Sequence, residues 1–456
     1  MDSKQREIEE LIDKLTVVFK SQIKELLSKF SSSSTKFLDF ELNLHKKLSE
    51  IGRATLEDAI PYLYGNGYVG PTFTSEEGDV YGCYEKTKIR TLKTIFGKVS
   101  FERSRYYNEE LGLTRSVTDI HMDIEGKKYC PLLRYWSCLL GTVCPFDEGS
   151  DIMHKLTGAS VSASDVRNIT EGIAKKIAKE HDKAILRVKL DEEDKVEPAK
   201  ITVNKNSEKI IYFETDGCHV PTLDAWKECK TLLLFEMKKE GEKNILLNKH
   251  YFSSLRDIKY FKRQVKKQLE NYCKRKEVNI VCIGDGADWI WNMVHELVPE
   301  GVTEILDWYH IEEKIWELAN ELYLEDKVKI KSFVDEQLEW LKKGNTGILI
   351  QNLCKLKNKE KNKLKFELID RLLKYIENNK ERMKYDLYKK EGHCIGSGAI
   401  ESANKYVIQR RLKLPGIRWE PENAEYMAHL RAEYINRKLE GFLGINYNPL
   451  LEIAET

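Results

Sequence analysis

The order of apolar and amphipathic runs in residues 209–306 constrains the fold of this chain more than any other feature of the sequence. Short apolar runs predict strands, and apolar positions spaced three and four apart predict helices. In chain order, we predict strands at 209–215, 231–237 and 250–254, a helix at 257–275, a strand at 278–284, a helix at 288–297 and a strand at 302–306. The order β-β-β-α-β-α-β predicts one mixed sheet in which the first and fourth strands are central neighbours.

This strand order is that of the ribonuclease H fold. From about 308 to 390 the sequence is almost wholly helical and highly charged, which predicts a helical insertion. A helix that starts near Gly398 would then close the fold. The predicted class is therefore α/β plus α: a ribonuclease H-like mixed sheet, an all-helical insertion and a mainly helical N-terminal region that bears a basic β-hairpin.

With 456 residues the chain is too long for one ordinary core, and its character changes along its length. Residues 86–107 read as two basic strands about a turn at Gly97, and 147–182 read as two helices that resemble a helix-turn-helix. We predict an N-terminal helical region (1–80), a region with the basic β-hairpin and the helix-turn-helix-like segment (81–185), a charged linker (186–207), the first part of the α/β domain (208–307), the helical insertion (308–390), and the closing helix with a C-terminal tail (391–456).

The N-terminal helical region allows two interpretations. Residues 4–30 have helical spacing, the run 31–34 breaks it, and a second helix is predicted over about 36–60. One interpretation is an arm for dimerisation or for binding DNA ends. The other is an ordinary helical hairpin packed on its own chain.

Composition limits where a nucleic acid could bind. The 75 basic and 74 acidic residues nearly cancel, so any such contact must come from local basic patches. The sequence contains no 18-residue apolar run, so it predicts no membrane span. The N-terminus begins as a charged amphipathic helix and not as a signal peptide. The ten scattered cysteines are typical of reduced thiols. We expect a cytoplasmic protein without a membrane partner.

Three acidic residues stand where phosphoryl-transfer chemistry needs them. Asp216 and Asp285 each follow an apolar run and precede a glycine, and Glu401 lies in the predicted closing helix. The carboxyl ends of parallel strands open into one crevice, so the two aspartates should converge there. Carboxylate oxygens suit Mg²⁺ or Mn²⁺, and two such ions stabilise the attacking and leaving oxygens. We predict all three acids as catalytic residues and metal ligands; the alternative is that each Asp-Gly is an ordinary turn.

A second cluster, Leu306-Asp307-Trp308-Tyr309-His310, lies at the end of the fifth predicted strand. We predict Asp307 and His310 as accessory residues beside the site, where His310 could contact the scissile strand or a phosphate. Asp307 also competes with Asp285 as the second metal ligand. The alternative is that Asp307 caps the next helix.

Two basic segments are candidates for DNA contact. In the hairpin 86–107 the only acidic residue is Glu102, and a two-stranded ribbon fits a DNA groove. Residues 402–418 hold five basic residues and no acidic one. The candidate DNA-binding residues are Lys88, Arg90, Lys93, Arg103, Arg105, Lys405, Arg410, Arg411 and Lys413. The alternative is a solvated hairpin and a solvated helix face.

These segments together resemble a known group, the ISLre-type insertion-sequence transposases, which are DDE enzymes long regarded as an uncharacterised family. The matching stretches are Tyr-Phe-Glu-Thr-Asp-Gly-Cys-His-Val, Ile-Gly-Asp-Gly-Ala-Asp-Trp-Ile-Trp, Leu-Asp-Trp-Tyr-His, Gly-Ser-Gly-Ala-Ile-Glu-Ser-Ala-Asn-Lys, Arg418-Trp419 and Arg-Thr-Leu-Lys-Thr-Ile-Phe-Gly-Lys-Val. The resemblance covers nearly the whole chain. More distantly, the Asp-x-x-His before a helical insertion resembles Mutator-like transposases.

The resemblance implies a DNA transposase in which Asp216, Asp285 and Glu401 are the DDE residues. Such an enzyme would bind the terminal inverted repeats of its element, cleave the element ends by metal-dependent hydrolysis and join the 3′-hydroxyls to target DNA. Its partners would be double-stranded DNA at the repeats and the target, and a second copy or more of itself, in the bacterial nucleoid. The alternatives are a structure-selective nuclease on the same fold and an inactive or domesticated DNA-binding regulator.

Overall fold

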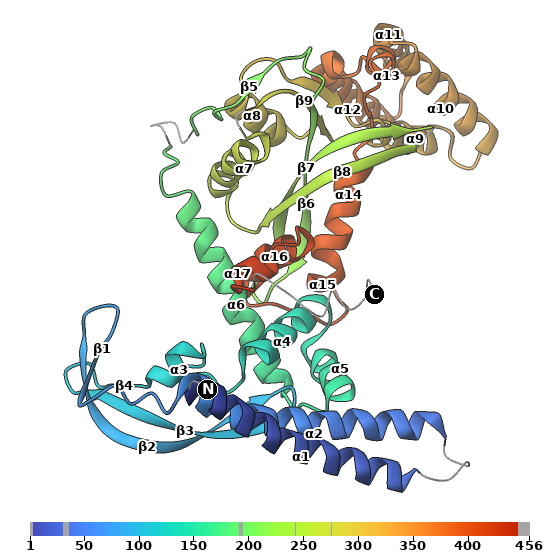
Figure 1. Cartoon of the computed structure of the whole chain (residues 1–456). Coiled ribbons are helices and arrows are strands. Elements are labelled where there is room, and N and C mark those ends of the chain that lie inside the picture. Colours follow the sequence, from blue (N-terminus) through green and yellow to red (C-terminus); the bar gives the residue numbers. More distant parts are fainter. Residues whose placement is uncertain (1–2, 31–35, 191–194, 242, 275, 446–456) are drawn as a thin grey trace. The chain divides into compact units, whose positions relative to one another are not determined.

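The computed structural model describes residues 3–30, 36–190, 195–241, 243–274 and 276–445. The chain divides into two compact units, Met1–Thr170 and Glu171–Thr456 (Figure 1). Helix α6 (Ala163–Ala184) begins in the first unit and ends in the second. The finer division into six segments that the sequence suggests stays a prediction.

The first unit joins a helical hairpin to a small antiparallel sheet and three further helices. Its elements are α1 (Ser3–Lys29), α2 (Phe37–Tyr64), β1 (Thr72–Thr74), β2 (Val80–Thr94), β3 (Gly97–Asn108), β4 (Leu113–Arg115), α3 (Val117–His121), α4 (Pro131–Val143) and α5 (Phe146–Thr157). The sheet has the order β1-β2-β3-β4, and β2 and β3 form the basic ribbon that the sequence predicts. Gly97, at φ +108°, begins β3 directly after the turn between them.

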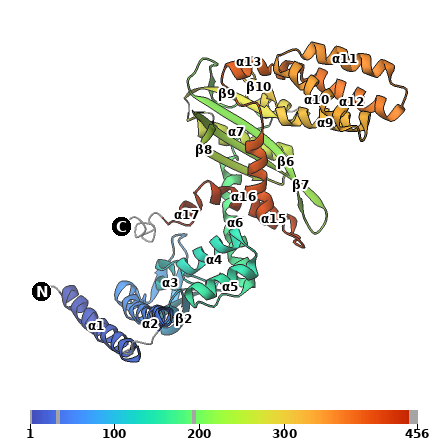
Figure 2. The ribbon, with the colours of Figure 1, turned by 90° about the vertical axis from the view of Figure 1, so that its right-hand side faces the viewer.

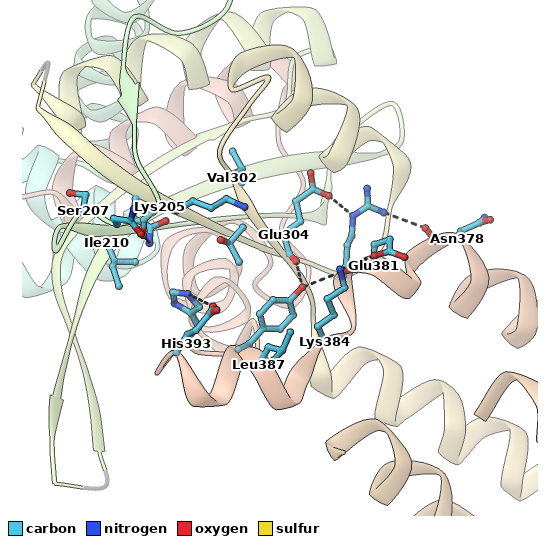
Figure 3. Close-up of a pocket in the computed structure, with 16 residues that line it drawn as sticks. Lys205, Ser207, Ile210, Val302, Glu304, Asn378, Glu381, Lys384, Leu387 and His393 are labelled. Atoms are coloured by element: carbon cyan, nitrogen blue, oxygen red, sulfur yellow. Dashed lines mark hydrogen bonds and ion pairs between the residues drawn. The ribbon is translucent and has the colours of Figure 1, made fainter. Parts of the chain in front are cut away.

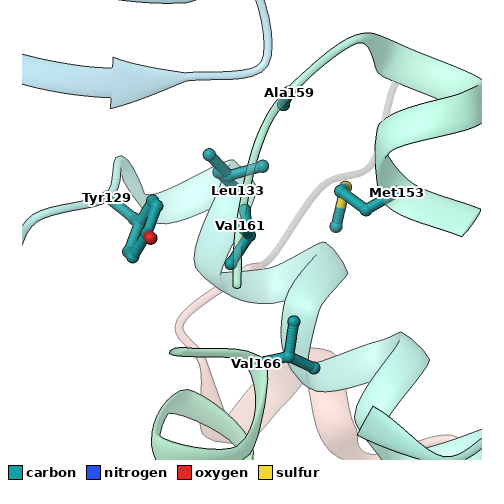
Figure 4. Close-up of a cluster of buried hydrophobic side chains, with 6 residues drawn as sticks. All are labelled: Tyr129, Leu133, Met153, Ala159, Val161 and Val166. Atoms are coloured by element: carbon teal, nitrogen blue, oxygen red, sulfur yellow. The ribbon is translucent and has the colours of Figure 1, made fainter. Parts of the chain in front are cut away.

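A buried cluster joins α4, α5 and the start of α6 (Figure 4). Leu133, Met153 and Val166 are at most 1% exposed, as apolar positions at helical spacing should be when helices pack. Gly158 ends α5 in the left-handed conformation, and the hydroxyl of Ser162 accepts a hydrogen bond from the Asp165 amide at the start of α6. Local sequence signals therefore fix where these two helices end and begin.

The second unit is built on a six-stranded mixed sheet. Its strands are β5 (Thr202–Val203), β6 (Ile210–Pro221), β7 (Trp226–Glu240), β8 (Lys243–Ser254), β9 (Glu277–Gly284) and β10 (Thr303–Leu306). The order is β10-β9-β6-β7-β8, with β5 paired to β9. The β6–β9 and β9–β10 pairs are parallel, whereas β6–β7 and β7–β8 are antiparallel. The first and fourth strands predicted from the sequence, β6 and β9, are thus central neighbours.

The predicted end of the first strand is wrong. The sequence prediction gives that strand as 209–215, ending at Asp216, but β6 continues to Pro221 and pairs Asp216 with Thr231 of β7. The parallel pairing with β9 ends earlier, at Glu214, so β6 and β7 extend beyond β9 as a two-stranded arm. Asp216 therefore lies within a strand, at the level where the neighbouring parallel strand has just ended.

Helices cover both faces of this sheet. They are α7 (Ile258–Cys273), α8 (Asp288–Leu297), α14 (Gly398–Ala403), the π-helix η2 (Asn404–Gln409), α15 (Arg410–Leu412), α16 (Pro421–Ile435) and α17 (Leu439–Phe442). Helices α7 and α8 lie on one face, and α14 lies on the other face against β6 and β7 (Figures 1 and 2). The alternation of strands and helices between 210 and 306 is the one that the sequence predicts.

The helical insertion follows β10 directly. It comprises α9 (Trp308–Tyr323), α10 (Lys327–Lys342), α11 (Thr346–Lys359), α12 (Lys363–Asn379), the 3-10 turn η1 (Lys380–Arg382) and α13 (Tyr385–Lys390). The hydroxyls of Tyr385 and Tyr388 donate to the β10 carbonyls of Leu306 and Glu304, both at 3.0 Å. The insertion is therefore tied to the strand that precedes it.

Within the described ranges, no helix combines the length and the apolar character that crossing a membrane requires.

Candidate active site

Asp216 lies half-buried on β6, between two hydrogen-bond donors. Its Oδ1 accepts from the Gly217 amide at 2.7 Å, and its Oδ2 accepts from Asn404 Nδ2 at 2.8 Å. Burial raises the pKa of Asp216, the two hydrogen bonds lower it, the charge of Asp285 raises it and His310 lowers it. Asp216, Asp285 and His310 are therefore close enough to interact electrostatically.

Asp285 follows β9 directly, in a loop held by the helical insertion. Its Oδ1 accepts from the Ala287 amide at 2.9 Å, and the Tyr375 hydroxyl of α12 donates to its carbonyl at 2.6 Å. Gly286 has φ +94°, and a Cβ atom there would lie 2.8 Å from the Tyr375 ring. Burial and the charge of Asp285 raise the pKa of Tyr375, which keeps its hydroxyl a donor. Gly286 is thus required because the backbone after Asp285 passes close to the Tyr375 ring.

Asp307 is 1% exposed and both of its carboxylate oxygens are occupied. Oδ1 accepts from the amides of Tyr309 and Ser397, both at 3.0 Å, and Oδ2 accepts from the Ser397 hydroxyl at 2.5 Å. Asp307 caps the N-terminus of α9, the alternative that the sequence left open, and it also anchors the chain just before α14. This arrangement favours Asp285 over Asp307 as the acid that faces Asp216.

Glu214 is a buried acid that the sequence prediction missed. It precedes Asp216 by two residues, so both side chains emerge on the same face of β6. Its Oε2 accepts from the Ile400 amide at 2.9 Å, and its Oε1 has no hydrogen-bond partner among the described residues. Burial raises the pKa of Glu214 to about 8, and the charge of Asp307 adds to that effect. A glutamate in the middle of an apolar strand run was the available signal.

Glu401 lies on α14, directly after Ile400, whose amide donates to Glu214. Its side chain is 54% exposed, and its Oε2 lies 3.9 Å from Lys405 Nζ. The helix then widens into the π turn η2, whose first residue, Asn404, is the one that binds Asp216. The helix of Glu401 is therefore fastened beside Asp216 at two points, while the Glu401 carboxylate itself faces solvent.

The predicted metal ligands are only partly brought together. Nowhere in the described part of the chain do three His, Cys, Asp or Glu side chains form a group that could hold a metal ion. Asp216 and Asp285 interact, His310 lies nearby on the first turn of α9, and the exposed Glu401 does not join them in such a group.

The structure separates the predicted DNA-binding residues into two kinds. Lys405, Arg410 and Lys413 are exposed on or just after the π turn. Arg411 is fully buried, with its guanidinium 5.0 Å from the centre of the Trp419 ring, so it is withdrawn from the candidate DNA contacts. The strip of basic residues that follows Glu401 is consequently narrower than the sequence suggests.

In the basic ribbon, each candidate has a local partner. Arg90 and Arg103 both form ion pairs with the buried Asp119, so their charges point into the unit. Lys88 and Arg105 lie 3.3 and 3.1 Å from carboxylate oxygens of Glu85. The remaining candidate, Lys93, donates to the Ser160 carbonyl at 3.2 Å. Lys88, with a side chain that is 51% exposed, is the most accessible of the five.

A polar pocket of about 890 Å³ lies near the starts of β6, β9 and β10, between these strands and α13 (Figure 3). Its charged side chains are largely paired with each other: Arg382 with Glu304 at 2.5 Å and Lys384 with Glu381 at 2.7 Å. Asp216 lies beyond the β6 residues that pair with β9, and Asp285 follows the end of β9, so this pocket is separate from the acidic site.

Comparison with known proteins identifies relatives without an assigned role. The sequence model of an uncharacterised protein family, UPF0236, matches residues 148–442. A UPF0236 protein of Caldanaerobacter subterraneus subsp. tengcongensis is 25% identical over 365 residues, which cover 76% of this chain and 68% of the relative. Its name carries eleven locus designations. A UPF0236 protein of Streptococcus gallolyticus, from the vanSb 3′ region, is 23% identical over 373 residues, 80% of this chain and 76% of the relative.

Proposed function

Because the chain belongs to the uncharacterised protein family UPF0236, we propose its function from the acidic site: it is a DNA transposase of an insertion sequence. It would bind terminal inverted repeats, cleave the element ends by metal-dependent hydrolysis and join the 3′-hydroxyls to target DNA. The sheet order, with β6 and β9 as parallel neighbours beside two antiparallel strands, supports a ribonuclease H-like fold for this activity.

The observation that carries the proposal is the pair of acids, Asp216 on β6 and Asp285 directly after its parallel neighbour β9. They repel each other, and neither forms an ion pair with a described basic residue. Paired carboxylates without a cation fit Mg²⁺ or Mn²⁺, which prefer such oxygens. Asp216 and Asp285 would hold the metal, with Glu401 completing the ligand set for a second ion. Bound there, two metal ions supply charge stabilisation for the attacking and leaving oxygens.

The surrounding residues have positioning roles in this proposal. Gly217 and Asn404 orient the two oxygens of Asp216, and Tyr375 fixes the backbone of Asp285. Glu214 and Asp307 hold the residues just before Glu401, which limits how far that side chain must turn to reach Asp216.

Basic side chains beside the acids would bind the DNA backbone. Lys405 lies one helical turn beyond Glu401 and is exposed, as are Arg410 and Lys413. Such residues position a duplex without reading its sequence. His310 would contact a phosphate next to the scissile bond.

The relatives support a mobile element. One of them carries eleven locus designations under one organism. A protein encoded at many places in a single genome is what an insertion sequence produces by copying itself.

Cleavage of the repeats that flank its own gene tests the function. We expect the wild-type protein to cut a labelled duplex of these repeats in Mg²⁺, and Asp216→Asn to bind the duplex without cutting it. The matched control is Asp288→Asn, an exposed aspartate three residues after Asp285, which should cut normally. Undiminished cutting by Asp216→Asn would overturn the proposal.

The same assay separates the alternatives. Cutting without joining to a target duplex would identify a structure-selective nuclease. Binding without cutting by the wild-type protein would identify a DNA-binding regulator, an outcome that the exposed position of Glu401 would then explain.

A further inference from the structure

We propose that the α1–α2 hairpin is the surface through which two copies of this chain associate, with α1 of one copy antiparallel to α1 of the other. This inference stands apart from the acidic site and goes beyond the proposed catalysis. It rests on the width of the apolar surface, the side on which it lies and the pattern of charges beside it.

The apolar surface of α1 is wider than its contact with α2. Leu11, Leu15, Val18 and Leu26 are partly or fully buried, and they form the stripe toward α2. A second stripe contains four apolar side chains that are 40–57% exposed: Ile8, Ile12, Phe19 and Leu27. At 3.6 residues per turn, this second stripe lies roughly 80° around the helix from the first. Half of the apolar face of α1 thus remains uncovered by the described residues.

Helix α2 repeats this arrangement. Its partly buried side toward α1 includes Phe40 and Leu44, while Phe37 and Leu48, roughly 50° around the helix from that side, are 72% and 47% exposed. In both helices the exposed stripe is displaced in the same rotational sense from the buried one. Because the helices are antiparallel, equal rotations bring the two exposed stripes to the same side of the hairpin. The hairpin therefore presents one two-helix apolar face, of a kind that monomeric proteins seldom expose.

The charges beside this face are complementary to a second copy of it. Along the outer edge of the exposed stripe of α1 lie Glu9 and Asp13, then Lys20 and Lys24. All four side chains are exposed, and none forms an ion pair with a described residue. Within one helix they make two like-charge pairs at i,i+4, which are unfavourable.

An antiparallel copy converts these repulsions into attractions. The positions are symmetric about a point between Thr16 and Val17, so that Glu9 faces Lys24 of the copy and Asp13 faces its Lys20. The symmetry operation then repeats both pairs, as expected for a two-fold interface. Apolar positions flanked by such charges are the pattern that sets orientation and partner in helical bundles. DNA fits this face less well, because Glu9 and Asp13 would repel phosphates.

Charge reversal in the full-length protein tests the proposal, with sedimentation equilibrium as the readout. We expect the wild-type chain to sediment at twice its mass of 53.2 kDa. Glu9→Lys/Asp13→Lys makes the edge wholly basic and Lys20→Glu/Lys24→Glu makes it wholly acidic, so each variant alone should sediment as a monomer. An equimolar mixture of the two should regain the dimer mass, because a basic edge then meets an acidic one.

The control inserts similar charge on the opposite side of α1. Glu10→Lys/Ser21→Lys should keep the dimer mass, and circular dichroism should show that all variants retain their helices. The apolar variant Ile12→Asp/Phe19→Asp should be monomeric and should stay monomeric when mixed with either charge variant. A monomeric wild type, dimers of either charge variant alone, or a mixture that fails to dimerise would each overturn the proposal.

Discussion

Two sites of buried acidic side chains, one in each unit, differ in whether a basic side chain neutralises them. In the first unit, Asp119 is 3% exposed and forms ion pairs with Arg90 and Arg103. In the second, Glu214 and Asp216 on β6 have hydrogen bonds to amide groups but no ion pair with a described residue. Burial lowers the pKa of Arg103 to about 10, which leaves it charged near neutral pH, whereas burial raises the pKa of Glu214 to about 8.

The difference separates structural charge from charge held for a ligand. A buried acid with two arginines is already neutralised, and its removal would leave two partly buried cations without a counter-charge. A cluster of acids that lacks a cation is under electrostatic strain, which a bound metal ion would relieve. The same residue types at similar burial can therefore have different roles, and substitutions should distinguish them.

The largest expected effect is on the stability of the compensated centre, which is the buried Asp119 with its two ion-pair partners Arg90 and Arg103. Asp119→Asn should destabilise the first unit by about 3–5 kcal/mol, because two partly buried guanidiniums lose their buried counter-charge. Hydrogen exchange of full-length protein should show faster exchange across β2 and β3. Asp123→Asn, an exposed acid paired with Arg134 in the same unit, should change exchange little. Equal changes in hydrogen exchange for Asp119→Asn and Asp123→Asn would contradict a structural role specific to the buried Asp119.

Next in size is the pH dependence of stability at the uncompensated centre, which is the group of acids Glu214, Asp216 and Asp285. The pKa of Glu214 in the folded protein, about 8, is above its ordinary value of 4.5. Its contribution to stability is therefore complete below pH 4.5 and is lost as pH rises toward 8. Relative to Glu214→Gln, metal-free wild type should lose a few kcal/mol across that window. Thermal melts of both proteins from pH 5 to 9 measure this, and parallel curves would contradict it.

Metal addition should stabilise only the uncompensated centre. Binding to the folded state at about 100 times the dissociation constant contributes about 2.7 kcal/mol. Melting curves with and without Mg²⁺ should therefore shift for wild type and for Asp288→Asn, but not for Asp216→Asn or Asp285→Asn. A shift common to all four proteins would indicate binding elsewhere on the surface.

The smallest expected effect concerns the orientation of the Asp216 carboxylate by Asn404. Asn404→Ala removes the hydrogen bond to Asp216 Oδ2 and should lower kcat for repeat cleavage about tenfold, as loss of a residue that orients a metal ligand does. Because Asn404 does not touch DNA in this proposal, KM should stay constant. Gln409→Ala, at the other end of the π turn, is the matched control and should leave kcat unchanged. A change in KM alone would assign Asn404 to DNA binding instead.

The sequence predicts the order of elements in the second unit well, because apolar runs identify strands wherever both faces are buried. The acids also follow from pattern, since Asp285 marks the end of β9 and Glu401 lies in a helix as expected. Which charged side chains pair with each other cannot be predicted from the sequence pattern. Arg90 finds Asp119 at a distance of 29 residues along the chain, a contact that only the folded ribbon and α3 create. Glu214 was overlooked for a similar reason, because its partner is the backbone of Ile400.

The helical segment from Gly398 to Leu412 has one further consequence, for which of its basic side chains a ligand can reach. Its buried positions are Ile400, Ala403, Asn404, Val407, Ile408, Arg411 and Leu412, so a spacing of three and four residues continues through the π turn at Asn404–Gln409. Arg411 falls on that buried side, whereas Arg410, roughly 100° away around the helix, faces solvent. The phase of this segment thus decides which of two adjacent arginines remains available to a ligand.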